Sequence, residues 1–594
     1  MSLEAYATLT ILALTFLALI KTRVPPAAVF LGALTAAMTL GLAPIPRLLS
    51  GFSNQGMLTV AVLFVVAAGM YSTGAVSRII EPLVGSPKTT LAAQARILPS
   101  LAAGSAFLNN TPLVAMLIPV IQDMARQGAL SVRQLFIPLS FASIMGGACT
   151  VIGTSTNLIV AGLVADALSG GKTVPGLRQI AMFDPAWPGV PVALTGMIFL
   201  MALTRFLLPA RKGQTDASPF TRCYSGEFRV KSSGGLSGKP LSETGFTGTP
   251  GLTLLSLARE DENVLQEKDP VLKAGDSIAV TADRQALIDL WREDNLIPLH
   301  GVTPTENRHD HLLVSAVVSG ISSVAGRRVR SLPTSESPYH FRVVALSRDG
   351  DCVDTPLART RIQAGDHVLL EVEESFHYHS QIEQDFIMTK PLKGCYLKRT
   401  HRSLPAALIT AAMVLAAAFG LMSMLNAALL ASVAMVATGC LTLRIAARSI
   451  DWETLLVIAC AIGLGAAATE SGLASHIASM VVRAGGNSPW ITLAAVFAGT
   501  SIMTNVITNN AAAAFMFPIA LSAAQGLDVN AMPFVIVIMI SASCAFISPA
   551  GYQTNLMVWE PGNYHFTDFV RMGLPLTLVI GVLTIFLVPL VFHF

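Results

Sequence analysis

The feature that most limits how this chain can fold is a series of apolar runs, each nearly as long as a membrane-spanning helix. A helix needs about 20 mostly apolar residues to cross a bilayer. Such runs occur on both sides of the chain's middle, for example residues 26–43, 189–208 and 574–591. Only 13% of the 594 residues are charged, about half the usual share in a soluble domain. We therefore predict a polytopic α-helical membrane protein.

A middle segment, between Arg211 and Arg402, holds much of the charge. Three motifs recur within it in the same order and at nearly the same spacing. They are residues 234–241 and 322–329, 254–261 and 343–350, and 272–280 and 362–370. A nearly fixed offset indicates two copies of one unit. We expect a soluble α/β insert of two similar small domains, 211–305 and 306–400, between two transmembrane halves, 1–210 and 401–594.

The two transmembrane halves also resemble each other. Residues 72–79, 110–119 and 140–160 match residues 470–477, 509–518 and 540–558, in the same order. Most arginines and lysines near span ends fall on one side if the N-terminus is outside and the segments around Asn110 and Asn509 are re-entrant hairpins. The exceptions are Arg47, Lys172, Arg178 and Arg483. This arrangement predicts inverted repeats in the inner (plasma) membrane, with a cytoplasmic insert.

Four polar segments interrupt the apolar halves at matching positions: "FLNNTPLVAMLIP" (107–119), "ITNNAAAAFMFP" (507–518), "TVIGTSTN" (150–157) and "SPAGYQTN" (548–555). A backbone break in lipid leaves unpaired N–H and C=O groups, at several kcal/mol each. Such breaks are tolerated where protein or a water-filled cavity satisfies them. We expect re-entrant hairpins and unwound helices whose ends meet at one central cavity.

These segments have the chemistry of an ion site. Helix N-termini attract anions, and carbonyls of unwound chain, with Asn, Ser and Thr oxygens, coordinate Na⁺. The segments contain no carboxylate or histidine, which favours Na⁺ over proton coupling. Glu470, the only carboxylate well placed within a core-like run, is the alternative coupling residue, unless it simply faces water at a helix end. The asparagines could instead only join helices through hydrogen bonds.

Other features narrow the class of protein. Seven cysteines show no paired or metal-like spacing, and we expect them to be reduced. A net charge of +3 does not indicate a nucleic-acid partner, and none is expected. The insert lacks the GxGxxG of a dinucleotide fold, and the chain has no evident catalytic constellation. We predict that the protein is not an enzyme.

The segments "NNTPLVAMLIP" and "TNNAAAAFMFP" resemble the paired Ser-Asn-Thr hairpin motifs of the divalent-anion/sodium symporters, in the ion transporter superfamily. "GGACTVIGTSTNLIV" and "SPAGYQTNLMVWEPGNYHF" are similar to the two unwound helices of that family, and the second is typical of its sulfate-transporter-like branch. The insert resembles two C-terminal regulatory domains (TrkA-C) of potassium-uptake regulators, which that branch carries. The resemblance covers essentially the whole chain and implies a homodimer with an elevator-type motion.

The resemblance also implies the site residues. A first Na⁺ site would use Ser105, Asn109, Asn110 and the Cys149 carbonyl, and a second Thr504, Ile507, Asn509 and the Ile547 carbonyl. Substrate contacts would be Asn110, Thr111, Thr150, Asn509, Asn510 and Ser548. Asn510 departs from the family pattern, because an amide replaces a hydroxyl. That change puts dicarboxylate specificity in doubt.

We therefore expect a Na⁺-coupled symporter that imports a small divalent oxyanion, with sulfate as the favoured substrate. The nearest alternative substrate is a C4-dicarboxylate or another small organic anion. A cation channel gated by the insert is a different class, but the sequence has no TVGYG-type filter. The insert is expected to regulate transport by binding a small ligand such as a nucleotide; a rigid spacer or dimer-stabilising module is the alternative.

Overall fold

The computed structural model of the protein describes residues 2–22, 24–76, 78, 85, 87, 89–127, 130–169, 174–209, 223–231, 236–244, 246, 252–259, 262–263, 269–292, 295–301, 311–320, 322–332, 341–353, 355–373, 385–391 and 402–594. The chain forms two compact units. Met1–Arg211 and Thr400–Phe594 make a helical unit, and Lys212–Arg399 make the insert. The domain boundaries predicted at 210–211, 305–306 and 400–401 fall outside the described residues.

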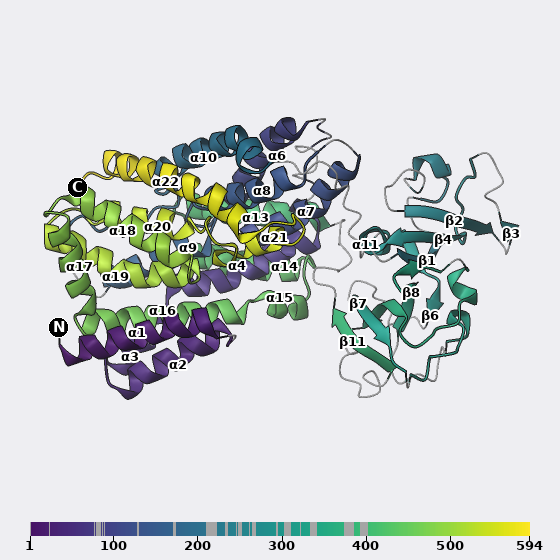
Figure 1. Ribbon diagram of the computed structural model, residues 1–594, viewed down its shortest axis with the longest axis horizontal. Helices are drawn as coiled ribbons and strands as arrows, with labels where there is room; N and C mark the ends of the chain where they lie inside the picture. Colours follow the sequence, from purple (N-terminus) through teal and green to yellow (C-terminus); the bar gives the residue numbers. More distant parts are fainter. Residues whose placement is uncertain are drawn as a thin grey trace. The chain divides into compact units, whose positions relative to one another are not determined.

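The helical unit is built from two sets of apolar helices (Figure 1). The N-terminal half contains α1 (Leu3–Lys21), α2 (Pro26–Thr39), α3 (Ile45–Leu48), α4 (Gln55–Ser72), α6 (Thr90–Ser105), α7 (Asn110–Gln127), α8 (Arg133–Gly147), α9 (Ser155–Ser169) and α10 (Ala186–Leu207). The C-terminal half contains α13 (Ser403–Ala418), α14 (Met424–Ala437), α15 (Leu443–Ser449), α16 (Trp452–Glu470), α17 (Leu473–Ala484), α18 (Pro489–Thr504), α19 (Asn509–Leu527), α20 (Met532–Ser543), α21 (Gln553–Trp559) and α22 (Phe566–Val591).

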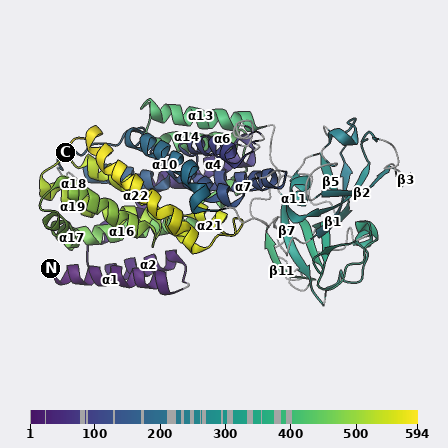
Figure 2. The same cartoon turned by 45° about the horizontal axis from the view of Figure 1, so that its top comes forward.

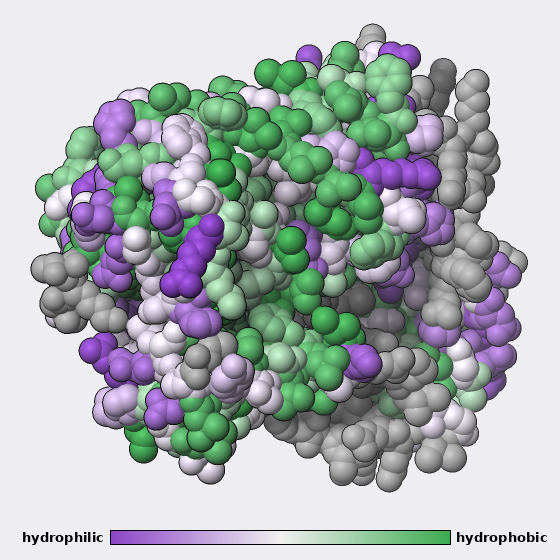
Figure 3. Space-filling model, turned by 60° about the vertical axis from the view of Figure 1, so that its left-hand side comes forward, coloured by the Kyte–Doolittle hydropathy of each residue, from purple (hydrophilic) through white to green (hydrophobic). Residues whose placement is uncertain are grey.

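The surface and helix lengths fit a bilayer. In the described part of the chain, six helices are long and apolar enough to span a membrane: α1, α4, α10, α16, α19 and α22. Hydrophobic residues cover much of the helical surface that Figure 3 presents. Most other helices of the described residues are apolar but shorter. The predicted polytopic α-helical membrane fold, with a sheet-containing insert, is confirmed.

The two halves of the helical unit are copies that interlock. Equivalent helices follow one another in the same order in both halves, from α1 and α13 to α9 and α21. The first two helices of each half pack against the other half: α1 and α2 against α16, and α13 and α14 against α4 (Figures 1 and 2). Small residues permit close packing of this kind, since a Cβ on Gly463 would lie 2.1 Å from the Leu48 carbonyl oxygen.

The insert contains one antiparallel sheet whose strands repeat in order. The strands are β1 (Cys223–Val230), β2 (Leu252–Arg259), β3 (Glu262–Asn263), β4 (Ser277–Asp283), β5 (Leu296–Pro298), β6 (His300–Gly301), β7 (His311–Val318), β8 (Phe341–Arg348), β9 (Asp351–Cys352), β10 (His367–Glu373) and β11 (Phe386–Pro391), with helix α11 (Arg284–Arg292). In the first copy β4 lies between β1 and β2, and in the second β10 lies between β7 and β8. Pairing of β1 with β8 joins the copies. One apolar core lies mainly in the first copy and extends into the second through Leu313, Val344, Ala345 and Leu369, and another lies within the second copy.

An ion pair between a half-buried arginine and a buried aspartate recurs in both copies and explains two repeated sequence motifs. Arg259 donates from Nε and Nη2 to Asp276 over 2.9 and 2.7 Å. Arg348 makes the same pair with Asp366, over 2.8 and 2.9 Å. Each aspartate belongs to an "AGD" turn and also accepts a backbone N–H from within that turn. The bidentate pair therefore fixes the turn that starts the central strand of each copy.

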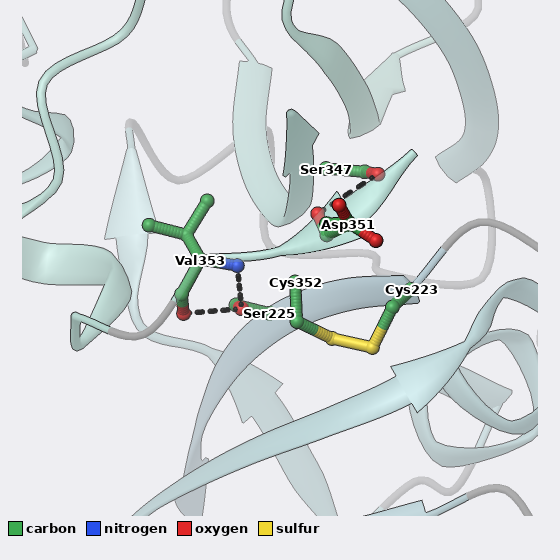
Figure 4. The surroundings of a disulfide bond; sticks show 6 residues. All are labelled: Cys223, Ser225, Ser347, Asp351, Cys352 and Val353. Carbon is green, nitrogen blue, oxygen red and sulfur yellow. Dashed lines mark hydrogen bonds between the residues drawn. A yellow bond between two sulfur atoms is a disulfide. The ribbon is translucent and has the colours of Figure 1, made fainter. Parts of the chain in front are cut away.

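The expectation that all cysteines are reduced is wrong for one pair. Cys223 at the start of β1 forms a disulfide with Cys352 in β9 (Figure 4). The bond connects the two copies of the insert, beside Ser225, which bonds both the N–H and the C=O of Val353. The two cysteines are 129 residues apart and meet only because β1, β8 and β9 share one sheet. Sequence spacing therefore carries no signal of the pairing.

Cys223→Ser is expected to loosen the junction between the two copies. Loss of a disulfide that closes a long loop typically costs about 2–4 kcal/mol. Hydrogen–deuterium exchange of the full-length protein should show faster exchange in β1, β8 and β9, and reductant should reproduce the effect in the wild type. If reductant leaves the exchange of these strands unchanged, the disulfide does not stabilise the junction.

The contacts of Glu227 indicate that the junction between the two copies of the insert is sensitive to acid. The Glu227 carboxylate accepts hydrogen bonds from His300 Nε2 (2.8 Å), Ala358 N (3.1 Å) and Ser277 Oγ (3.3 Å). Burial raises the pKa of Glu227, but the hydrogen bond and charge of His300 and the two other donors outweigh it, and the net pKa is lowered. A lowered carboxyl pKa stabilises the fold above the ordinary value of 4.5, and this stabilisation is lost as the pH falls through the folded-state pKa.

We therefore expect exchange at β1 and at residues 357–359 of the full-length protein to accelerate as the pH drops below the ordinary glutamate pKa, after correction for the intrinsic rate. Glu227→Gln should already exchange faster at neutral pH and should lose the acid dependence. Equal acid sensitivity in the variant and the wild type would contradict this assignment.

Candidate functional site

The two hairpins end where their second helices begin. The tip of the first hairpin lies between α6 and α7, and α7 starts at Asn110. The tip of the second lies between α18 and α19, and α19 starts at Asn509, with Thr508 accepting the Ala511 N–H at 3.4 Å as N-cap. Each tip thus presents the N-terminal end of an apolar helix, where backbone N–H groups lack partners within the helix.

Matching hydrogen bonds hold each hairpin against the broken helix of its own half. Ser105 Oγ donates to the Ser143 carbonyl over 2.7 Å, and the equivalent Thr504 Oγ1 donates to the Ala542 carbonyl over 2.5 Å. Within the breaks, Asn157 Nδ2 donates to the Thr150 carbonyl (2.7 Å) and Asn555 Nδ2 to the Ser548 carbonyl (3.2 Å). All of these donor side chains are fully buried. The asparagines of the breaks therefore satisfy the interrupted backbone.

Oxygen atoms crowd around the buried Asn110. Ser105 Oγ has one proton but faces two acceptors, Asn110 Oδ1 and the Ser143 carbonyl. A Cβ on Gly147 would lie 2.8 Å from Asn110 Oδ1, and a Cβ on Gly153 would lie 2.9 Å from the Ser105 carbonyl oxygen. The absence of side chains at both glycines lets backbone and amide oxygens approach one another. Such a cluster has fewer protons than acceptors, which suits a bound cation.

Two of the predicted site residues, Thr150 and Cys149, form contacts within the N-terminal half and not with the cavity. Thr150 Oγ1 donates to the Ala106 carbonyl and accepts the Gly153 N–H at 3.1 Å. Cys149 packs beside Gly189 of α10, and its thiol donates to the Met145 carbonyl. The Cys149 side chain therefore supports the first break rather than the hairpin tip.

The second break is held by a residue that the sequence analysis did not single out. Asn505 Oδ1 accepts the N–H groups of Ile547 and Ser548, both at 3.0 Å. Asn505 corresponds in the repeat to Ala106, whose carbonyl meets Thr150 in the first half. Ser548 and Ile507 are both buried, as part of the second break and the second hairpin tip.

A cavity of about 290 Å³ lies between the two hairpin tips. It is lined by both tips and by both breaks: Asn109, Thr111, Thr508, Asn509, Asn510, Ser155, Ala550, Gly551, Tyr552 and Gln553, with Pro26, Phe64, Asp451, Glu453, Thr454, Val457 and Leu556. Of the predicted site residues, Asn109, Thr111, Asn509 and Asn510 reach it directly. Its size is at the lower end of the roughly 300–1,000 Å³ typical of ligand pockets. None of these lining residues is Lys, Arg or His.

Hydrogen bonds between the halves cross this cavity's wall at symmetry-related positions. Thr111 Oγ1 donates to Gln553 Oε1 over 3.0 Å, and Ser155 Oγ donates to Asn510 Oδ1 over 3.0 Å. Thr111 and Asn510 are equivalent in the repeat, as are Ser155 and Gln553. Each hairpin tip is thus joined to the broken helix of the other half.

The tips also differ. Asn110 Nδ2 donates to Tyr552 Oη over 2.6 Å, whereas within the described residues the Asn509 side chain has no hydrogen-bond partner. Thr154, which occupies the Tyr552 position in the first half, is too short for the equivalent contact. Asn509 is 8% exposed and lines the cavity, so its amide remains available to a ligand.

Four further residues that line the cavity were not predicted from the sequence: Tyr552, Gln553, Asp451 and Glu453. The first two could have been found from the repeat, because "TSTN" and "YQTN" align and place them opposite Thr154 and Ser155. Asp451 is the N-cap of α16 and accepts the Thr454 N–H, as Asn54 caps α4. Glu470, the alternative coupling residue, ends α16 and is exposed.

Comparison with known proteins identifies the family. The citrate transporter (CitMHS) profile matches residues 16–538 and 469–594. An uncharacterized transporter of Synechocystis sp. is 30% identical over 574 residues, or 93% of this chain and 92% of the relative. A putative sulfur deprivation response regulator of Chlamydomonas reinhardtii is 29% identical over 565 residues, or 90% of this chain and 93% of the relative. Sodium/sulfate cotransporter 2 of the same organism is 24% identical over 739 residues, or 89% of this chain and 83% of the relative.

These matches confirm the resemblance to ion transporters and the expectation that the protein is not an enzyme. The resemblance of the insert to potassium-uptake regulatory domains stays a prediction. The chain is a multi-pass membrane transporter and belongs to the citrate transporter family.

Proposed function

We propose that this transporter is a Na⁺-coupled symporter that imports a small divalent oxyanion, with sulfate as the favoured substrate. The observation that carries the proposal is the cavity between the hairpin tips. The N-terminal ends of α7, α9 and α19 all contribute residues to its lining. Helix N-termini favour anions through their free N–H groups and the helix dipole. They supply this attraction without any basic side chain among the lining residues.

Cations would balance the substrate's charge. We place the first Na⁺ at the oxygens of Ser105, Asn109 and Asn110 with the neighbouring backbone carbonyls. The single Ser105 proton facing two acceptors supports this placement, because a cation stabilises the acceptor left without a proton. The second Na⁺ would be held around Thr504, Ile507, Asn509 and the carbonyls of the second break. We place the substrate against Thr111, Asn509 and Asn510, while Asn110, Thr150 and Ser548 hold the surrounding chain.

The relatives support sulfate over the alternatives. Sodium/sulfate cotransporter 2 of Chlamydomonas reinhardtii aligns with 89% of this chain. A C4-dicarboxylate or citrate-like substrate is the second candidate, favoured by the matching family profile. We further propose inverted repeats, an elevator-type motion of a homodimer in the plasma membrane, and a cytoplasmic insert that regulates transport through a ligand such as a nucleotide.

Uptake by the purified full-length protein in liposomes tests the proposal. Labelled sulfate and labelled succinate are supplied separately, each with an inward Na⁺ gradient or with a pH gradient alone. We expect sulfate accumulation that follows the Na⁺ gradient and persists when only the pH gradient is collapsed. Accumulation driven by the proton gradient in Na⁺-free buffer would refute Na⁺ coupling, and accumulation of succinate but not sulfate would refute the substrate.

A further inference from the structure

Two amide side chains in the cavity wall have their carbonyl ends fixed by hydroxyl groups. Asn510 Oδ1 accepts from Ser155 Oγ at 3.0 Å and from Thr156 Oγ1 at 3.2 Å. Gln553 Oε1 accepts from Thr111 Oγ1 at 3.0 Å. In each case the hydroxyl comes from the opposite half of the molecule. The amides are therefore oriented by the way the two repeats meet.

This orientation decides what the amides offer to a ligand. A carboxamide has an acceptor oxygen at one end and two N–H donors at the other. Because the oxygens are engaged, the NH₂ groups of Asn510 and Gln553 are the ends left for the cavity, and within the described residues neither has a hydrogen-bond partner. Asn510 is only 8% exposed, so its NH₂ group cannot rely on bulk solvent, whereas the Gln553 side chain is exposed and its NH₂ group contributes less to selection.

Tyr552 lines the same cavity and adds a phenolic hydroxyl to the amides of Asn510 and Gln553. Its hydroxyl oxygen accepts from Asn110 Nδ2 at 2.6 Å, and the Thr154 hydroxyl also interacts with it. A hydroxyl that accepts one hydrogen bond can still donate one. We call Asn510, Gln553 and Tyr552 the donor wall, because all three line the cavity and carry N–H or O–H groups, and the N–H groups of the two amides have no partner among the described residues.

We propose that Asn510 and Gln553 determine specificity by selecting an oxyanion in its fully deprotonated form. The inference rests on the proposed function and narrows its substrate class. Sulfate and selenate have only acceptor oxygens at neutral pH, whereas phosphate retains at least one P–OH proton. Against the donor wall this proton would face N–H groups instead of an acceptor. At the buried Asn510 an unpaired donor costs roughly 1–3 kcal/mol, which corresponds to about a five- to hundredfold preference.

Two carboxylates, Asp451 and Glu453, also line the cavity and would act in the opposite sense if they accepted a proton from the ligand. Asp451 has both oxygens engaged, by the Thr454 N–H at 3.1 Å and the Thr454 hydroxyl at 2.7 Å. Glu453 lines the cavity with an exposed side chain and could accept a P–OH proton. Glu453→Gln therefore serves as the control that separates its contribution from that of the donor wall.

The test measures the ratio of the phosphate and selenate concentrations that half-inhibit sulfate uptake. This ratio does not depend on the expression level. Labelled sulfate uptake by the full-length protein in liposomes at neutral pH is competed with selenate and with phosphate. We expect phosphate to need at least about fivefold higher concentration than selenate for half-inhibition. Ser155→Ala/Thr156→Val frees the Asn510 amide to turn its oxygen toward the cavity, and the ratio should fall several-fold. Ser155→Thr/Thr156→Ser keeps both hydroxyls and should keep the ratio.

Thr111→Val removes the hydroxyl that holds the Gln553 amide. It provides a second measurement of the ratio if Ser155→Ala/Thr156→Val does not transport. Equal competition by phosphate and selenate in the wild type would overturn the proposal, as would a ratio unchanged in both hydroxyl-deleted proteins. Because Glu453 would favour phosphate by accepting its P–OH proton, Glu453→Gln should raise the ratio, and a ratio that falls in this variant would overturn the assignment of the selection to the donor wall.

Failure of the sulfate assignment is distinguishable from failure of this inference. If the wild type takes up succinate and not sulfate, the proposed substrate is wrong. The preference for a fully deprotonated ligand is then tested by measuring succinate uptake at pH values on both sides of the second ionisation of succinate. Uptake that follows the concentration of the dianion supports the donor wall. Uptake that follows the monoprotonated form overturns it.

Discussion

Asn110→Ala and Asn509→Ala are each expected to reduce uptake ten- to hundredfold without affecting expression or membrane insertion. Asn110 is fully buried, with Oδ1 in contact with Ser105 Oγ and Nδ2 bonded to Tyr552 Oη. Asn509 lines the cavity, and its amide has no partner among the described residues. We assign each amide a role in holding a cation or the anion. Removal of one charge-assisted contact costs roughly 1.5–3 kcal/mol, or about a factor of ten per 1.4 kcal/mol.

The measurement is initial uptake in liposomes containing equal amounts of protein, with Asn426→Ala as the matched control. Asn426 lies in α14 with an exposed side chain, so its loss should leave uptake unchanged. Circular dichroism and thermal unfolding show whether each variant is folded. Uptake near the wild-type rate in both tip variants would end the assignment of the site to the hairpin tips.

Much of the helical unit could be predicted, because the sequence contains long apolar runs and motifs that recur in both halves. The apolar runs indicated the spanning helices. The nearly constant offset between the halves indicated that α7 corresponds to α19 and α8 to α20 in the repeat. The polar breaks were also visible, since Asn109 and Asn110 are costly in lipid unless a partner satisfies them. The repeated "AGD" motifs of the insert corresponded to repeated turns, held by Asp276 and Asp366.

Contacts between the halves could not be predicted, because they depend on how the two copies interlock. Nothing in the sequence around Thr111 indicates that its hydroxyl meets Gln553, which lies in the other half of the chain. The same applies to Ser155 and Asn510, and to Cys223 and Cys352 in the insert. These pairs are local in space and remote in sequence. A single sequence reveals the elements of the site but not which group faces which end of an amide.

Gly153→Ala is expected to remove nearly all uptake, because its Cβ would meet fixed backbone. It would lie 2.4 Å from the Gly147 carbonyl oxygen and 2.9 Å from the Ser105 carbonyl oxygen. Real Cβ atoms essentially never approach this closely, so the first break must move away from the hairpin. Overpacking of this kind typically costs about 1–3 kcal/mol. The displaced carbonyls are those that we assign to the first Na⁺ site, so Na⁺ binding should suffer with the fold.

Gly551→Ala is the matched variant in the second half. Its Cβ would lie 3.0 Å from the Thr504 carbonyl oxygen and 3.1 Å from Ala545 Cβ, which a shift of a few tenths of an ångström relieves. Na⁺ titration of uptake should therefore show partial activity for Gly551→Ala, and a half-saturating Na⁺ concentration at least about tenfold higher for any residual activity of Gly153→Ala. An unchanged Na⁺ titration for Gly153→Ala would contradict the first site. Greater damage from Gly551→Ala would mean that the second break, which has more room around its glycine, carries the stricter cation requirement.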